Sequence, residues 1–88
     1  MYFVYVLRNS EGRYYIGQTS NVALRLQRHN NGTVLWTKNR GPWELVYIQR
    51  FETRSEAMGE ERRLKGLKSK AALAKLVAQS VESRQGRD

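Results

Sequence analysis

The stretch YFVYVLRNSEGRYYIG, residues 2–17, decides the fold of this chain. Its two ends, residues 2–7 and 14–17, are rich in β-branched and aromatic side chains, which favour strands. Between them, residues 9–12 read Asn-Ser-Glu-Gly, and these residue types favour turns. The stretch therefore predicts a β-hairpin.

The residues after the hairpin predict one helix and a third strand. Ser20 or Asn21 can cap a helix over about 21–31, which ends at residues that tolerate left-handed backbone. A polar loop follows over residues 32–42. Residues 43–48 then alternate less strictly than a solvent-facing strand does, which predicts a central strand covered on both faces.

Two more helices and a tail are predicted for the last part of the chain. Thr53 and Glu56 have the spacing of a capping box, which opens a helix that runs through about Lys65. Ser69 can cap a third helix. After Val81, residues 82–88 have no apolar side chain that could pack against the core, so a flexible tail is expected over residues 81–88.

The fold class predicted from these elements is α/β, with the order β-β-α-β-α-α and a three-stranded antiparallel sheet flanked by helices. A chain of 88 residues can build one hydrophobic core but cannot divide it, so a single domain over residues 1–80 is expected. Cysteine is absent, which excludes disulfides and thiol chemistry and suits a reducing cytoplasm. The apolar run at residues 2–7 is too short to cross a membrane, so no membrane partner is expected.

The charge of the chain points to a polyanionic partner. Sixteen Lys and Arg against eight Asp and Glu give a formal net charge of +8. The sequence pI is about 10.3. Such a field attracts DNA and RNA, because neutralised phosphates release their condensed counterions. The alternative is that the charge only keeps the protein in solution. Nothing in the sequence indicates an obligate protein partner.

Glu61 is the most informative acidic residue. At 100° per residue it falls near the middle of the helix arc formed by Ala57, Met58 and Leu64, whereas Glu60 falls toward the edge of that arc. A carboxylate that faces the core must be paired, protonated or bound to a cation, because desolvating it alone is costly. Both a structural ion pair and a metal ligand are open at this point.

A second group of candidates lies on the hairpin and the first helix. Tyr5 and Tyr15 lie on adjacent predicted strands, where their hydroxyls can meet at one rim of the sheet. Arg25 and His29 are one helical turn apart, close to the apolar face. Gly17 leaves room for another group to approach closely. Each of these residues taken alone also fits ordinary packing.

Taken together, these residues resemble the GIY-YIG nuclease family over about residues 2–77. The resemblance is closest to small stand-alone bacterial members. They share the YVL segment at residues 5–7, the YYIGQT segment at residues 14–19 and the Arg-Leu-x-x-His-Asn-x-Gly segment at residues 25–32. It implies a GIY-YIG fold with Gly17 as a packing position of the motif. The matching residues are Phe3-Val4-Tyr5, Tyr15-Ile16-Gly17, Arg25, His29 and Glu61.

The resemblance implies a metal-dependent endonuclease that hydrolyses DNA. Glu61 would bind one Mg²⁺ or Mn²⁺, which stabilises the leaving 3′ oxygen. Arg25 would neutralise charge on the phosphate oxygens. Tyr5 or Tyr15 would orient the attacking water and take its proton, helped by positive charge from Arg25, the cation and His29. His29 is the alternative proton acceptor, because its ordinary pKa suits that role better.

The resemblance also implies contacts with nucleic acid, DNA rather than RNA. Gln18 stands where many relatives carry Lys, and residues 62–78 lack the Asn that some relatives have there. Without an added recognition domain, selectivity for DNA shape is expected, as in repair or recombination. A non-catalytic binding module and an RNA-directed protein are the alternatives. The expected nucleic-acid contacts are Gln18, Lys38, Arg40, Arg62, Lys65 and Lys68.

Overall fold

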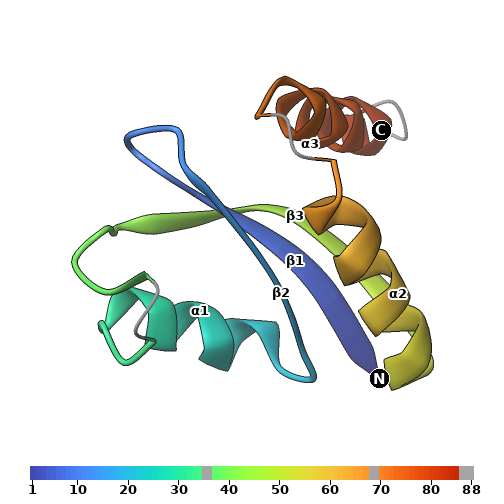
Figure 1. Ribbon diagram of the computed structural model, residues 1–88, viewed down its shortest axis with the longest axis horizontal. Coiled ribbons are helices and arrows are strands. Elements are labelled where there is room, and N and C mark those ends of the chain that lie inside the picture. The colour runs from blue at the N-terminus through green and yellow to red at the C-terminus, as the bar shows by residue number, and fades with distance from the viewer. Residues whose placement is uncertain (35–36, 68–69, 86–88) are drawn as a thin grey trace.

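A computed structural model describes residues 1–34, 37–67 and 70–85 of the chain. Its sheet is antiparallel with the strand order β2-β1-β3, and it lies between α1 on one face and α2 and α3 on the other (Figure 1). The predicted β-β-α-β-α-α order and three-stranded sheet are confirmed. The elements are β1 (Tyr2–Asn9), β2 (Tyr14–Thr19), α1 (Val22–Asn30), β3 (Trp43–Phe51), α2 (Arg54–Lys65) and α3 (Lys70–Gln85).

The central strand is β1, which pairs with β2 along one side and with β3 along the other. The prediction that residues 43–48 form the central strand is therefore wrong, because β3 lies at an edge of the sheet. Its weak alternation has another cause: α1 packs on one face of β3, and α2 and α3 pack on the other. Burial on both faces removes the pattern that would mark an edge strand.

The hairpin turn is closed by the buried side chain of Asn9. Its Oδ1 accepts hydrogen bonds from the backbone N–H groups of Glu11, at 3.1 Å, and Arg13, at 2.8 Å. Its Nδ2 donates to the carbonyl of Arg40, at 3.0 Å. One side chain thus closes the turn and also fastens the loop between α1 and β3 to the hairpin.

Side chains of β1 alternate between two hydrophobic clusters. Val4 and Val6 face α2 and α3, where they pack with Tyr47, Ala57, Leu64 and Val77. Tyr5 and Leu7 face α1, where they pack with Trp43, Leu26 and Tyr15. The alternation follows from the period of a strand, which sends successive side chains to opposite faces. Tyr5 is consequently carried to the face that α1 covers.

Helix capping agrees with the sequence patterns. The side chain of Asn21 accepts a hydrogen bond from the N–H of Leu24 at 3.1 Å and caps α1. Thr53 and Glu56 form the predicted capping box of α2. The prediction that Met58 faces the core is wrong, because this residue is 41% exposed. The residues of α2 that are buried are Ala57 and Leu64.

Helix α3 packs through Leu73 and Val77, which are both buried. It continues to Gln85, so the first residues of the predicted tail are helical. The domain boundary at residue 80 stays a prediction. Ser69, the predicted cap of this helix, lies outside the described residues. Within the described part of the chain, every helix is too short or too polar to cross a membrane.

Candidate active site

The ring of Tyr5 lies directly over Gly17. Tyr5 is 1% exposed, and it pairs with Gly17 in the register of β1 and β2. A Cβ atom added to Gly17 would lie 2.6 Å from the Tyr5 hydroxyl oxygen and 2.8 Å from Cζ. These distances are far inside van der Waals contact, so only glycine allows the Tyr5 ring to cross β2 here. The room predicted at Gly17 is therefore filled by Tyr5.

Three side chains from β1 and α1 form a hydrogen-bonded cluster around the Tyr5 hydroxyl. Arg25 Nε donates to the Tyr5 oxygen at 3.3 Å. His29 Nε2 lies 3.0 Å from the same oxygen. Arg25 and His29 are one turn apart on α1, and both reach the sheet because this face of the helix packs on it. The cluster joins the hairpin to the first helix.

The ring of Tyr15 completes this cluster. Its centroid lies 4.6 Å from the His29 ring and 6.3 Å from the Tyr5 ring. Tyr15 pairs with Leu7, so it is the diagonal neighbour of Tyr5 on the same face of the sheet. The structure therefore brings together Tyr5, Tyr15, Arg25 and His29, as the pattern of the sequence predicts.

His29 is held as a neutral imidazole. Burial, and to a smaller extent the positive charge of Arg25, together lower its pKa to about 4. At pH 7 the ring therefore carries no positive charge. The expectation that His29 supplies positive charge to the tyrosines is wrong, and its ordinary basicity is not available to an attacking water either. What His29 does offer is a neutral nitrogen beside Tyr5.

The pKa of His29 makes stability depend on pH between about 6.5 and about 4. An unfolded histidine binds a proton near pH 6.5, whereas the folded one resists it, so acid favours the unfolded state. We expect the free energy of unfolding to fall by roughly 3 kcal/mol over this interval, in addition to what the carboxylates contribute. Urea unfolding at several pH values measures this, with His29→Gln as the control. Equal pH dependence in both proteins would contradict the prediction.

The Tyr5 hydroxyl remains protonated at neutral pH. Burial raises its pKa above 10, and the hydrogen bond and charge of Arg25 only partly oppose that effect. The charge of Glu61 raises the Tyr5 pKa as well. Positive charge from Arg25 therefore does not turn Tyr5 into a phenolate. To act as a base, Tyr5 therefore has to pass its own hydroxyl proton to a neighbouring group.

Glu61 projects from α2, which packs against β1 and β2 from the face opposite α1. Its side chain is 20% exposed and forms an ion pair with Lys65, with Oε2 2.9 Å from Nζ. No hydrogen bond joins it to Tyr5, Arg25 or His29 among the described residues. Its carboxylate nevertheless acts through its charge on the Tyr5 hydroxyl. Glu61 thus lies near the cluster without belonging to it directly.

Glu60 is more enclosed than the prediction from the helical arc allowed. Its side chain is 13% exposed, against 20% for Glu61, although the helical arc places Glu61 nearer the middle of the buried face. Both its oxygens bind the Arg63 guanidinium, at 2.7 and 2.8 Å. The Tyr47 hydroxyl lies 3.3 Å from Oε2. The hydrogen bonds from Arg63 lower the pKa of Glu60 and pair its carboxylate, so Glu60 has a structural role.

The acidic residues limit what kind of metal site is possible. Among the described residues, no three His, Asp or Glu side chains gather as metal ligands. A Mg²⁺ ion tolerates this, because it keeps several waters and often binds through one carboxylate plus substrate phosphate. Glu61 suits that mode, since Lys65, its ion-pair partner in the described part of the chain, is 57% exposed and can move into solvent.

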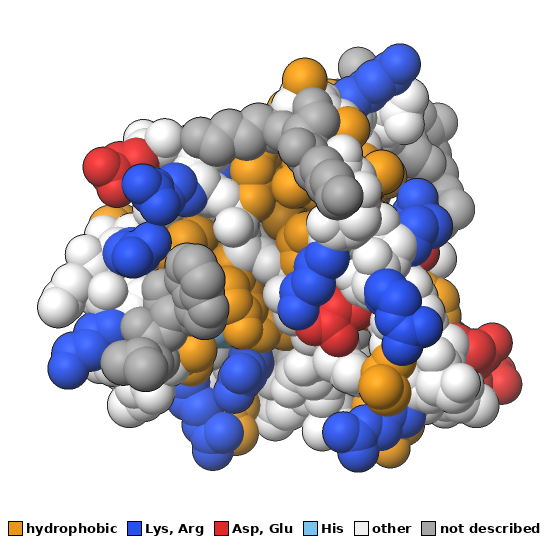
Figure 2. Space-filling model, in the orientation of Figure 1, with side chains coloured by type: hydrophobic (Ala, Val, Ile, Leu, Met, Phe, Trp, Pro, Cys, Tyr) orange, Lys and Arg blue, Asp and Glu red, His pale blue; other side chains and the backbone are white. Residues whose placement is uncertain are grey.

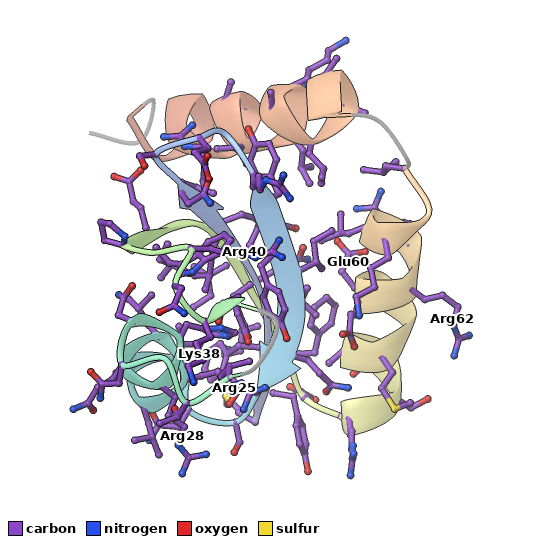
Figure 3. The ribbon with its side chains drawn as sticks, turned by 60° about the vertical axis from the view of Figure 1, so that its left-hand side comes forward. Arg25, Arg28, Lys38, Arg40, Glu60 and Arg62 are labelled. Atoms are coloured by element: carbon purple, nitrogen blue, oxygen red, sulfur yellow. The ribbon has the colours of Figure 1, made fainter. Side chains whose placement is uncertain are left out.

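The basic side chains do not form one patch. Lys and Arg side chains lie at several separate places on the visible face (Figure 2). Arg25, Arg28, Lys38 and Arg40 come from α1 and the loop that follows it (Figure 3). Arg62 projects from α2 away from the sheet and away from these residues (Figure 3). The structure thus gathers some of the predicted nucleic-acid contacts and separates others.

The remaining predicted contacts are placed as follows. Gln18 lies in β2 beside Gly17 and is half-buried. Lys65 is occupied by its ion pair with Glu61. Lys68 lies outside the described residues. All of these assignments to nucleic acid, Arg62 included, stay predictions.

The sequence patterns missed Thr37. It is 1% exposed and lies in the loop that was expected to be a polar connection. Its hydroxyl oxygen lies 2.7 Å from His29 Nδ1, and its carbonyl accepts a hydrogen bond from Trp43 Nε1 at 3.2 Å. Periodicity carries no information in a loop, so nothing in the sequence singles out this threonine.

Comparison with known proteins agrees with this geometry. Residues 1–75 match the family described as "GIY-YIG catalytic domain". A UPF0213 protein of Oceanobacillus iheyensis is 43% identical over 67 residues, which cover 75% of this chain and 78% of that protein. A UPF0213 protein of Listeria monocytogenes is 40% identical over 83 residues, which cover 93% of this chain and 92% of the relative.

A solved structure is similar as well. The solution NMR structure of a UPF0213 protein from Bacillus halodurans superimposes with a TM-score of 0.58 at 34% sequence identity. The match covers 90% of this chain and 85% of that protein. The family match spans the three strands, the helices α1 and α2, the four clustered residues and the two acidic residues described above, which are Tyr5, Tyr15, Arg25, His29, Glu60 and Glu61. This chain therefore belongs to the GIY-YIG family.

Proposed function

We propose that this protein is a metal-dependent endonuclease that hydrolyses phosphodiester bonds in DNA, with a preference for branched or flapped substrates in repair or recombination. The observation that carries the proposal is the buried Tyr5 hydroxyl, which is bound by Arg25 and His29 and influenced by the charge of Glu61. Packing alone gives no reason to gather a phenol, a guanidinium and an imidazole at one point.

Arg25 is the residue proposed to bind the scissile phosphate. Its Nε is held by Tyr5, which fixes the plane of the guanidinium before substrate arrives. A donor held in advance stabilises developing charge without reorganising, and one such donor contributes about 2.7 to 4 kcal/mol at comparable oxyanion sites. A phosphate bound there would also offset the effect of Arg25 on His29, which raises the low pKa of that imidazole.

Tyr5 is proposed to hold the attacking water and to accept its proton. The Tyr5 hydroxyl has a nitrogen acceptor within hydrogen-bond distance, His29 Nε2 at 3.0 Å. As the phenol proton moves to that nitrogen, the oxygen can take the proton of the water. Tyr15 then packs against the imidazole and limits its motion.

Glu61 is proposed to bind one Mg²⁺ or Mn²⁺. A divalent cation bound there would supply Lewis-acid stabilisation of the leaving 3′ oxygen. For this, Glu61 has to release Lys65, and an exposed ion pair of this kind costs little to break. The freed Lys65 ammonium remains available to a neighbouring phosphate of the DNA.

The direct test offers the purified protein end-labelled duplex, flap, branched and single-stranded DNA, and the matching RNAs. Each substrate is incubated with Mg²⁺, with Mn²⁺ and with chelator. Cleavage of branched or flapped DNA that requires the metal is the expected result. Salt-sensitive binding without cleavage would instead favour a non-catalytic module, and a clear preference for RNA would favour an RNA-directed protein.

Binding to DNA is expected to depend on the basic side chains near α1. We predict that Lys38→Ala weakens binding and lowers the slope of log affinity against log salt by about 1, because one phosphate contact is lost. Fluorescence anisotropy at several salt concentrations measures this slope. The control is Lys75→Ala on the exposed side of α3. This substitution changes the net charge by the same amount, but at a place far from α1 (Figure 1). Equal effects of the two variants would contradict a localised DNA surface.

A further inference from the structure

The hydrogen bonds of His29 continue beyond the cluster into the loop before β3. Nε2 lies 3.0 Å from the Tyr5 oxygen, and Nδ1 lies 2.7 Å from the Thr37 hydroxyl oxygen. Thr37 also has the geometry to donate its hydroxyl proton to the carbonyl of Val34, at 3.4 Å. Arg25 donates to Tyr5 at the opposite end of this chain of groups. His29, Tyr5 and Thr37 are each 1% exposed, so bulk water hardly reaches these bonds in the free protein.

A neutral imidazole can bind in this chain in two ways, because either ring nitrogen can carry the proton. With the proton on Nδ1, His29 donates to Thr37, Thr37 donates to Val34, and Tyr5 donates to Nε2. Every proton in the chain then has an acceptor. With the proton on Nε2, Thr37 donates to Nδ1 and the Tyr5 oxygen accepts from both His29 and Arg25.

The second arrangement is the poorer one. It leaves the buried Tyr5 hydroxyl proton without an acceptor among the described residues, and it removes the bond from Thr37 to Val34. A buried donor without a partner is disfavoured, and one neutral hydrogen bond corresponds to roughly a tenfold preference between two states. The first arrangement should therefore dominate.

We infer that Thr37 is a positioning residue that holds His29 with its proton on Nδ1, so that Nε2 is free to accept the proton of Tyr5. This inference rests on the proposed function for its consequence in the reaction, since Tyr5 can act as a base only if Nε2 is unprotonated. Thr37 touches neither Tyr5 nor Arg25 by hydrogen bonds. It acts through the imidazole alone.

The loop around Thr37 is built to keep this residue in place. Its carbonyl accepts a hydrogen bond from the buried Trp43 indole at 3.2 Å, and its backbone N–H donates to Val34 at 3.2 Å. Asn30 lies at the end of α1 and makes two hydrogen bonds to the backbone of Trp43. Its Oδ1 accepts from the Trp43 N–H at 2.7 Å, and its Nδ2 donates to the Trp43 carbonyl at 3.3 Å. The hydroxyl of Thr37 is thus fixed relative to α1, which also carries His29.

Nitrogen-15 NMR of the imidazole tests the inference directly, because His29 is the only histidine in the chain. At neutral pH we expect the wild-type spectrum to show a protonated Nδ1 and an unprotonated Nε2. Thr37→Val, which keeps the size of the side chain and removes its hydroxyl, should shift population toward the Nε2–H form. Thr37→Ser should restore the wild-type spectrum. A wild-type spectrum with the proton on Nε2 overturns the inference, even if Thr37→Val fails to fold.

The reaction provides the second readout. In Thr37→Val we expect kcat to fall about tenfold with KM unchanged, and Thr37→Ser should stay within about twofold of wild type. Thr33→Val is the matched control, because the Thr33 side chain is exposed and its hydroxyl donates to the Arg28 carbonyl, at 2.9 Å, and not to His29. A folded Thr37→Val protein with wild-type kcat overturns the positioning role. If the wild-type protein shows the expected tautomer and cuts no DNA, the Thr37–His29 assignment stands and the proposed function falls.

Discussion

Glu61→Gln is expected to abolish metal-dependent cleavage while leaving DNA binding almost intact. The substitution keeps the shape of the side chain and removes the charge that a divalent cation needs. Stabilisation of the leaving oxygen by a bound cation contributes several kcal/mol, so the loss should exceed about 100-fold in rate. Single-turnover cleavage measures the rate, and fluorescence anisotropy without metal measures binding.

The matched control is Glu60→Gln on the same helix. Glu60 is already bound by Arg63 and Tyr47, so its substitution should lower stability and leave most of the cleavage rate. Comparing the two variants distinguishes the effect of removing any negative charge from α2 from the effect of removing the proposed metal ligand Glu61. Loss of cleavage in Glu60→Gln, together with an active Glu61→Gln protein, would show that the wrong carboxylate is assigned.

Gly17→Ala should disrupt the Tyr5 cluster although it adds a single methyl group. The new Cβ would lie 2.6 Å from the Tyr5 hydroxyl oxygen, so the ring or strand β2 has to move. Overpacking of this kind typically costs about 1 to 3 kcal/mol of stability. The displaced hydroxyl also loses its geometry toward Arg25 and His29. We expect cleavage to fall by more than about 100-fold, in line with misplacement of reacting groups by about 1 Å.

Gly59→Ala is the control for this substitution. Gly59 lies inside α2, and a Cβ at this position meets nothing within 4 Å. Alanine there should stabilise the helix by about 0.5 to 1 kcal/mol and leave cleavage unchanged. Urea unfolding and cleavage rates of both variants test the comparison. A Gly17→Ala protein as stable and as active as wild type would contradict the described contact.

The local parts of the fold could be predicted from the sequence. The capping box at Thr53 and Glu56 and the cap at Asn21 depend on residues three positions apart, so they are visible without tertiary structure. The hairpin at residues 2–17 is likewise a local pattern. The position of β3 at the edge of the sheet is a tertiary property, and burial on both faces hid it.

The residues that form the candidate site could be predicted, but the protonation state of its histidine could not. Tyr5, Tyr15, Arg25 and His29 come together, as the family resemblance implies. The neutral state of His29 could not be predicted, because it depends on how deeply the ring is buried. No sequence pattern distinguishes Thr37 from the other polar residues of its loop. Its importance arises only when the loop brings a hydroxyl to the far side of the imidazole.

The most direct test of the account compares wild type with Tyr5→Phe in single-turnover cleavage of a 5′-labelled branched DNA in Mn²⁺. Phenylalanine fills the same space and removes only the oxygen that Arg25 and His29 bind. We predict that the wild-type protein cuts the strand and leaves a 3′-hydroxyl end, and that Tyr5→Phe binds equally well but cuts more than about 100-fold more slowly. Equal cleavage by the two proteins, or intact DNA with both, would contradict the claim that this hydroxyl is the centre of a nuclease site.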